Sequence, residues 1–257
     1  RDPDEGPRQL LADPSDPVAS PFGWHDFNGA PGAEFTVARG NNVWAYTDPL
    51  NNNDFLNNFT PDGGADLLFS YPIDLSQVPS SYASASVTNL FYWNNVTHDM
   101  FHYYGFDEAS GNFQFVNYSG EGVGGDPVLA EAQDGGGFTN ANFATPPEGL
   151  GFLPRMQMYL GGPDANGVIR DGSLDNHVIV HEYGHGISTR LVGGPTTNCL
   201  GSIEQGGEGW SDWLGNVMIA EVGDTGEMPI TVGNWLNGDG PNGAGFRPFP
   251  YSTDLNV

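Results

Sequence analysis

The sequence predicts an α+β protein in which strands come first and helices later. The 38 glycines and 20 prolines are spread over the 257 residues, which indicates many turns and long loops instead of a helical bundle. Strand-like segments dominate the first part of the chain, whereas two helix-like segments follow each other in its second part. We therefore expect a β-rich front part over residues 1–172 and a helical back part over residues 173–257.

The front part is expected to hold short strands and one long helix. The stretch PGAEFTVARGNNVWAYTDP offers two short β-type runs, and PVLAEAQDGGGFTNANFATP has the character of strands and turns. A helix is predicted over residues 87–105, because apolar and aromatic side chains recur there at helical spacing and Gly105 is a natural stop. In RMQMYL, residues 155–160, Met and Leu alternate with Arg, Gln and Tyr, as in a strand with one buried face.

The back part is expected to begin with two helices. The first is predicted over residues 173–192 and the second over residues 208–222. Gly193 and Gly223 directly follow these segments, so we expect them to act as the C-caps.

The charge balance excludes several classes of partner. The chain has 32 acidic and seven basic residues, all seven of them arginines, and its formal net charge is −25. Nucleic acids and anionic membrane surfaces need cationic side chains, so neither is an expected partner. We interpret the acids as a solvated surface that keeps a secreted protein soluble. Calcium sites are the alternative interpretation for a minority of these carboxylates.

Cysteine content and apolar runs add two constraints. Cys199 is the sole cysteine, so no disulfide can form within these residues, and we expect a small buried side chain there. No run of 18 or more apolar residues occurs, so no membrane span is predicted. The opening RDPDEGPRQLLADPSDP lacks an apolar signal region, and we expect it to be the exposed beginning of a mature chain.

The stretch DNHVIVHEYGHGISTRLVGGP has the spacing of a metal site. His181 and His185 are four residues apart, so on a helix both imidazoles point to one side and can bind one ion. Glu182, one residue further round, can reach a water on that ion. Zinc hydrolysis requires these three components: neutral nitrogen ligands, an open position for water and a nearby carboxylate. The alternative is a helix with two hydrogen-bonded core histidines.

The next helical stretch, GGEGWSDWLGNVM, supplies two further carboxylates. Glu208 at its start is the candidate third ligand, and Asp212 one turn later can accept the free ring N–H of a metal-bound histidine. Ser211 and Gly215 are small, so the two helices can approach closely. For Glu208 the alternative is a carboxylate stabilised by the helix dipole.

Three other histidines are not expected to bind metal. HDMFH places His98 and His102 four apart with Asp99 between them, but no third ligand with supporting context accompanies them. The aromatic residues of this segment favour packing. His177, one turn before His181, is expected to be a neighbour of the site and not a ligand.

HEYGHGISTRLVGGP followed by GEGWSD resembles the fungalysin family of secreted metallopeptidases. SPFGWHD, RGNNVWAY, TNANFATPPEG and RPFPYSTD extend this resemblance over nearly the whole chain. The resemblance implies a thermolysin-like two-lobed fold, in which the active-site helix lies between a β-rich and a helical lobe. It further implies zinc held by His181, His185 and Glu208, with Glu182 as catalytic base. Secretion and removal of an N-terminal propeptide are also implied.

The resemblance also implies substrate-binding residues. TNAN, which lies before RMQMYL, is similar to the edge-strand segment of the family, so Asn140 and Ala141 are candidates for binding the backbone of an extended substrate. Arg247 is similar to an arginine that holds a substrate carbonyl. The alternatives are an ordinary turn residue for Asn140 and a surface arginine paired with an acid for Arg247.

The expected function is a secreted endopeptidase that cleaves extracellular proteins through a zinc-activated water. The alternatives are a non-catalytic secreted module that binds zinc or calcium, and a zinc hydrolase with a non-peptide substrate. GPDANGVIRDG carries Asp164, Asn166 and Asp171 in a turn-rich stretch, but the glycine and the final glutamate of an EF-hand are misplaced there. Because the family's oxyanion-binding histidine would lie downstream of Val257, we expect a further C-terminal segment to complete the cleft.

Overall fold

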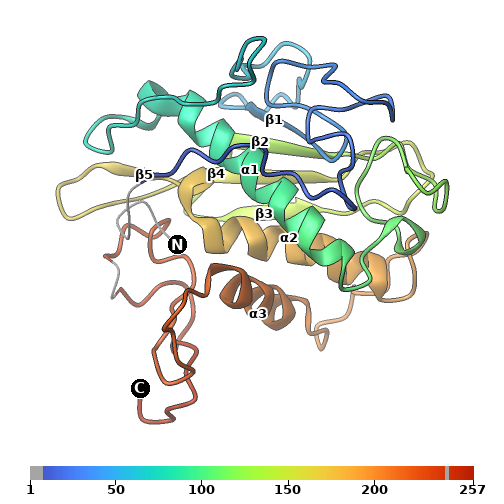
Figure 1. Ribbon diagram of the computed structural model, residues 1–257. Coiled ribbons are helices and arrows are strands. Elements are labelled where there is room, and N and C mark those ends of the chain that lie inside the picture. Colours follow the sequence, from blue (N-terminus) through green and yellow to red (C-terminus); the bar gives the residue numbers. More distant parts are fainter. Residues whose placement is uncertain (1–7, 241–242) are drawn as a thin grey trace.

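The computed structural model describes residues 8–240 and 243–257, and Figure 1 shows their arrangement. The first seven residues of the opening segment, where we expected an exposed start, lie outside the described residues. The described residues form one five-stranded sheet with helices packed against it, so the predicted α+β class is confirmed.

The strands are arranged in the order β1-β2-β4-β3. The fifth strand, β5, also pairs with β4, at residues further along β4 than those that pair with β3. β1 is parallel to β2 and β2 is parallel to β4, whereas β3 and β5 run antiparallel to β4. Within the described residues β3 pairs with β4 alone, which makes it an edge strand. The bounds are β1 Val43–Thr47, β2 Val128–Phe138, β3 Ala141–Ala144, β4 Arg155–Pro163 and β5 Ile169–Asp171.

Three α-helices accompany the sheet in the described part of the chain. Each of the three predicted helices is present, and none is both long and apolar enough to cross a membrane. In Figure 1, α1 crosses in front of the sheet, and α2 lies between the sheet and α3. The helices are α1 Ala83–His102, α2 Asn176–Leu191 and α3 Gly207–Ile219, with 3-10 turns at Pro79–Tyr82, Glu108–Ser110 and Gly172–Leu174.

The helix ends differ from the expected ones for local reasons. A 3-10 turn occupies residues 172–174, so α2 begins only after Asp175, whose carboxylate accepts a hydrogen bond from the Val178 amide at 3.2 Å. α3 ends at Ile219 because its C-cap is already extended, so the prediction that Gly223 is the C-cap is wrong.

Helices α1 and α2 cover one face of the sheet. Met156 and Met158 of β4 are fully buried against this layer, and burial of such a side chain contributes about 1.5–3 kcal/mol. Other side chains of this core come from β1, β2, α1 and α2, and include Val43, Ala45, Val87, Leu90, Phe91, Val128, Ala130, Ile179 and Ile187.

Loops cover the opposite face of the sheet. Its apolar residues are Trp44, Tyr46 and Leu129, packed against Phe27, Phe55 and Leu153. As a result Gln157 and Tyr159 of β4 are buried as well. The strand predicted at residues 155–160 is confirmed, but the prediction that only one of its faces is buried is wrong. Cys199, which we expected to be buried, is exposed.

The expected close approach of α2 and α3 is confirmed. A Cβ atom added to Gly184 of α2 would lie 2.9 Å from Ser211 Oγ and 3.0 Å from Ser211 Cα. A Cβ atom added to Gly215 of α3 would lie 2.7 Å from the ring of His177. These contacts leave no room for a methyl group, so glycine at both positions sets the spacing of the two helices that carry the candidate site.

Candidate metal centre

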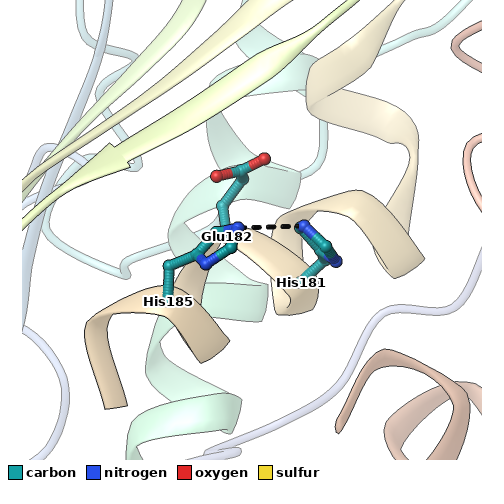
Figure 2. A group of neighbouring side chains, drawn as sticks. All are labelled: His181, Glu182 and His185. Atoms are coloured by element: carbon teal, nitrogen blue, oxygen red, sulfur yellow. Dashed lines mark hydrogen bonds between the residues drawn. The ribbon is translucent and has the colours of Figure 1, made fainter. Parts of the chain in front are cut away.

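Helix α2 presents both histidines of the HExxH motif on one side. His181 Nε2 lies 3.1 Å from His185 Nε2, and Figure 2 shows these two ring nitrogens pointing at each other, with the Glu182 carboxylate extending from the helix beside them. The His181 side chain is buried, whereas the His185 side chain is 24% exposed. The open side of this pair is therefore at His185.

Glu208, in the first turn of α3, brings a carboxylate to the two rings. Its Oε2 lies 3.4 Å from His181 Nε2, and its Oε1 lies 3.5 Å from His185 Nε2. Zinc bonds of about 2.0–2.1 Å in a tetrahedral arrangement separate neighbouring ligand atoms by about 3.3 Å. The three separations are close to this value, and Glu208 faces each imidazole with a different oxygen, so the three residues fit a single zinc ion that the carboxylate binds through one or both oxygens.

Asp212 lies behind the first histidine. Its Oδ1 is 2.7 Å from His181 Nδ1, the ring nitrogen that faces away from the other donors. Asp212 is buried, and it also accepts hydrogen bonds from Tyr251 Oη at 2.6 Å and from Arg247 Nε and Nη2 at 2.7 and 2.8 Å. These partners hold the pKa of the Asp212 carboxyl well below its usual range, although burial alone would raise it.

Glu182 is a buried carboxylate with one unsatisfied oxygen. Its Oε2 makes no hydrogen bond within the described residues. Burial raises the pKa of Glu182 to about 7; the charge of Glu208 adds to this increase and His181 opposes it. A carboxylate with a pKa near neutrality and a free oxygen beside the donor set is suited to exchange a proton with a water molecule.

The two histidines differ in their affinity for protons. Burial lowers the pKa of His181, but Asp212 and Glu208 outweigh burial and raise it to about 9. Burial and the charge of His181 lower the pKa of His185 to about 4. The contact with His181 is the main cause that lowers the pKa of Glu208, to about 2. Binding of a divalent cation at these atoms would therefore displace a proton from His181.

A cleft of about 390 Å³ opens in front of these residues. Asn140 and Ala141 line it at the start of the edge strand β3. Arg247, from the loop that follows α3, lines it as well. His181, Glu182, His185 and Glu208 are also in its wall. The structure thus brings every predicted site residue except the buried Asp212 into the lining of one cleft. The volume of this cleft is usual for ligand-binding sites.

Arg247 is engaged with the acids of α3. Besides its two bonds to Asp212, its Nη2 donates to Glu208 Oε2 at 3.0 Å. These bonds raise the pKa of Arg247 above its already high value. Arg247 therefore pairs with acids, as the alternative interpretation of the sequence stated. The same residue also lines the cleft, so the two interpretations are compatible.

His98, from the other histidine pair, belongs to a buried polar network. His98 Nδ1 lies 2.9 Å from Asp99 Oδ1, and His98 Nε2 lies 3.2 Å from Asn112 Nδ2. Asp99 in turn accepts hydrogen bonds from Trp24 and Ser20. This network joins α1 to loops on either side of it, as expected for packing. His177 contacts Asn216 of α3 at 2.9 Å.

The acids of GPDANGVIRDG do not converge on one ion. Asp164 Oδ1 accepts the backbone N–H groups of Asn166 and Val168 in the turn between β4 and β5. Asp171 is buried and accepts from Ser86 and Gln133. The described turn between β4 and β5 therefore does not have the geometry of an EF-hand, as the spacing of its residues indicated.

Sequence reasoning missed two features. Tyr251 was not singled out, although its hydroxyl group binds Asp212. A second group of buried carboxylates, Asp48, Glu131 and Asp134, was also missed. For this group a partial signal existed, because VLAEAQD places two acids, Glu131 and Asp134, in a segment read as a strand.

Comparison with known proteins gives consistent matches over the full length of the chain. A family model described as fungalysin metallopeptidase (M36) matches residues 1–257. The chain is 44% identical to the extracellular metalloproteinase MEP of Leptosphaeria maculans and 43% identical to the extracellular metalloproteinase mep of Aspergillus flavus. It is 45% identical to extracellular metalloproteinase 2 of Phaeosphaeria nodorum. Each match covers 100% of this chain but 39% of the relative.

Proposed function

Because this chain belongs to the fungalysin family of metallopeptidases, we propose that it carries the active site of a secreted, zinc-dependent endopeptidase. The observation that carries the proposal is the set of three donor separations, 3.1, 3.4 and 3.5 Å, among His181, His185 and Glu208. These residues would hold the ion. When bound, zinc lowers the pKa of water and polarises a carbonyl group.

Glu182 is the proposed general base. Its buried, unsatisfied Oε2 and its pKa of about 7 support a role in which it takes a proton from the attacking water. The same carboxyl group then returns the proton to the leaving amine, so it acts first as base and then as acid. No second side chain is needed to carry the proton in these two steps.

Asp212 is the proposed positioning residue. Its Oδ1, 2.7 Å from His181 Nδ1, would accept the ring proton there and leave the Nε2 lone pair directed at the metal. Arg247 and Tyr251 would keep the Asp212 carboxylate ionised and fixed in place.

The edge strand β3 is the proposed binding site for the substrate backbone. Its pairing with β4 uses one side of the strand, and its other side borders the cleft at Asn140 and Ala141. An extended peptide there would gain main-chain hydrogen bonds that do not depend on its side chains. Arg247 uses Nε and Nη2 for its hydrogen bonds to Asp212 and Glu208. We assign its Nη1 to a hydrogen bond with a substrate carbonyl.

Three further parts of the proposal rest on the family and on the names of the relatives. The fold is proposed to be thermolysin-like and two-lobed, with residues 1–172 in the β-rich lobe and 173–257 in the helical one. The position of α2 between the sheet and α3 supports this division. The relatives are named extracellular metalloproteinases, which supports secretion and protein substrates. A removable propeptide and a further C-terminal segment are proposed on the same basis.

The test measures zinc content and casein hydrolysis on the same preparation. We expect one zinc per chain and cleavage that 1,10-phenanthroline abolishes, whereas the non-chelating isomer 1,7-phenanthroline leaves it unchanged. Loss of cleavage with the chelator and its recovery on adding zinc would support the enzyme. A zinc-loaded protein without chelator-sensitive cleavage would favour the non-catalytic binding module instead.

A further inference from the structure

A second cluster of carboxylates lies outside the cleft. Asp48, Glu131 and Asp134 are all at most 1% exposed, and their carboxylate oxygens lie within 4.8 Å of one another. None of the three lines the cleft described above. Three buried acids this close together require a physical explanation, because ionised carboxylates are rarely buried without partners.

A bulge in β2 brings two of these acids together. In a regular strand, residues three apart point to opposite faces of the sheet. Here Glu131 pairs with Gln157 and Asp134 pairs with Tyr159, so β2 contains one residue more than β4 over this interval. Gln133, within the bulge, has a left-handed φ of 51°. The bulge turns Asp134 to the loop-covered face, where Glu131 already points.

The third acid arrives from the end of β1. Asp48 directly follows this strand, and its carboxylate accepts the backbone N–H groups of Asn52 and Asn53 at 3.0 and 2.7 Å. Asn58 Nδ2 also donates to it at 3.1 Å. Asp48 thereby organises the loop over residues 49–58 and holds that loop beside β2.

Two oxygens of the cluster have no hydrogen-bond donor. Tyr46 Oη donates to Glu131 Oε1 at 2.6 Å, and the Gly136 amide donates to Asp134 Oδ1 at 2.7 Å. The remaining atoms, Glu131 Oε2 and Asp134 Oδ2, are buried and make no hydrogen bond within the described residues. A buried acceptor without a partner is costly, so these two oxygens indicate a missing ligand.

The charge of the cluster indicates the sign of that ligand. Arg155 Nε is 3.8 Å from Glu131 Oε2, too far for a hydrogen bond, while Arg155 Nη1 donates to Asn53 Oδ1. One guanidinium group beside three carboxylates leaves an excess of negative charge. Burial raises the pKa of Glu131 to about 7 and also raises that of Asp134, to which Asp48 contributes. A divalent cation would remove this excess.

We propose that Asp48, Glu131 and Asp134 form a calcium site on the loop-covered face of the sheet. The donors are all carboxylate oxygens, which suit a hard cation and not zinc, for which nitrogen and sulfur donors are preferred. Calcium–oxygen bonds of about 2.3–2.6 Å place ligand atoms up to about 5 Å apart, which accommodates this cluster. The bound ion would fasten the 49–58 loop to the bulge of β2.

The site would also steady the edge strand. Gln157 Nε2 donates to Asn51 Oδ1 in the fastened loop at 3.3 Å, and Gln157 Oε1 accepts from Asn142 Nδ2 at 3.1 Å. Asn142 belongs to β3 and lines the cleft. The calcium proposal does not depend on the proposed peptidase function, since its tests measure ion binding and unfolding.

The first experiment uses the zinc-loaded protein in calcium-free buffer with zinc held constant. Added Ca²⁺ is expected to raise the midpoint of thermal unfolding by several degrees, with half-saturation at about 10⁻⁴–10⁻³ M, as in extracellular calcium modules. Mg²⁺ at the same concentration is expected to do less. Tb³⁺ is expected to show luminescence sensitised by Tyr46 and Trp44, which Ca²⁺ displaces.

Two variants and one control locate the effect. Glu131→Gln and Asp134→Asn are expected to weaken Ca²⁺ binding at least tenfold, whereas Asp164→Asn, in the turn between β4 and β5, keeps the parent's response. The proposal is overturned if Ca²⁺ does not stabilise the parent, or if both variants respond as the parent does, which would indicate diffuse binding to the acidic surface. If neither variant folds, the absence of sensitised Tb³⁺ emission from the parent overturns it.

Discussion

Asp212 Oδ1 lies 2.7 Å from His181 Nδ1, so the second helix of the site supports a histidine of the first from behind. The same carboxylate receives Arg247 and Tyr251 from a segment more than 30 residues further along the chain. Three separate parts of the sequence therefore meet at one buried acid. We therefore expect the orientation of His181 to depend on all of them.

Asp212→Asn is expected to lower zinc affinity or activity by about 10–100-fold, because the amide keeps the shape of the side chain but loses the charge that orients His181. Competition with a zinc-binding dye measures the affinity. Tyr251→Phe removes one donor to Asp212 and leaves the contact with His181 intact, so its effect should be smaller. Equal losses in the two variants would contradict the assigned role of Asp212.

Glu182→Gln is expected to keep one zinc per chain and to lose at least about 10²-fold in kcat, because the amide cannot take the proton of the attacking water. Metal analysis and casein hydrolysis on the same sample measure both quantities. Glu121→Gln, at an exposed position, serves as the control. Parent-level cleavage by the Glu182 variant would show that the base is another residue.

Glu208→Ala is expected to lose both zinc and activity, because it removes the oxygens 3.4 and 3.5 Å from the two imidazoles. Glu204→Ala, which removes an exposed acid shortly before α3, should change neither. Zinc content after dialysis against zinc-free buffer distinguishes the variants. A Glu208→Ala protein that retains one tightly bound zinc would mean that the third ligand lies elsewhere.

Arg247→Lys is expected to raise KM more than it lowers kcat if the guanidinium holds a substrate carbonyl. A lysine cannot reproduce the paired bonds to Asp212 or the fork that reaches Glu208. The zinc affinity of the Arg247→Lys variant therefore serves as the second readout, and it is compared with the zinc affinity of the Asp212→Asn variant. A loss of zinc affinity with an unchanged KM would make Arg247 a support for the acids of α3 alone.

Gly215→Ala is expected to destabilise the protein by about 1–3 kcal/mol, because the new methyl group would overlap the buried His177 ring. Gly209→Ala in the same helix meets no atom within 4 Å and should stabilise by about 0.5–1 kcal/mol through helix propensity. Thermal unfolding should thus shift in opposite directions for the two variants. Shifts of the same sign would argue against the tight spacing of α2 and α3.

The local part of this structure follows directly from sequence patterns. The spacing of His181 and His185 on a helix is a property of one turn, and helix periodicity located all three α-helices. The Asp212–His181 contact was also predictable, since Asp212 lies one turn after Glu208. Each of these predictions needs a single helix or one helix pair.

Contacts between distant segments were not predictable in the same way. The pairing of Arg247 with Asp212 depends on how a loop returns to α3, and no periodic pattern encodes that return. The second buried face of β4 depends on loops from the first 60 residues and from before β4. The carboxylate cluster needs the bulge at Gln133, and a one-residue insertion changes which face an acid occupies.

The parallel pairing of β1 with β2 has a consequence for how this chain acquires its structure. Val43 pairs with Val128 and Thr47 with Ala132, so roughly 80 residues must be gathered before the first parallel ladder can close. α1, formed from local contacts, can appear early, whereas the sheet must wait until β2 and β4 have both left the ribosome. During that interval the apolar VWAYT segment is an unpaired edge that can join another chain. Refolding from denaturant is therefore expected to be slow, and its yield should fall as protein concentration rises.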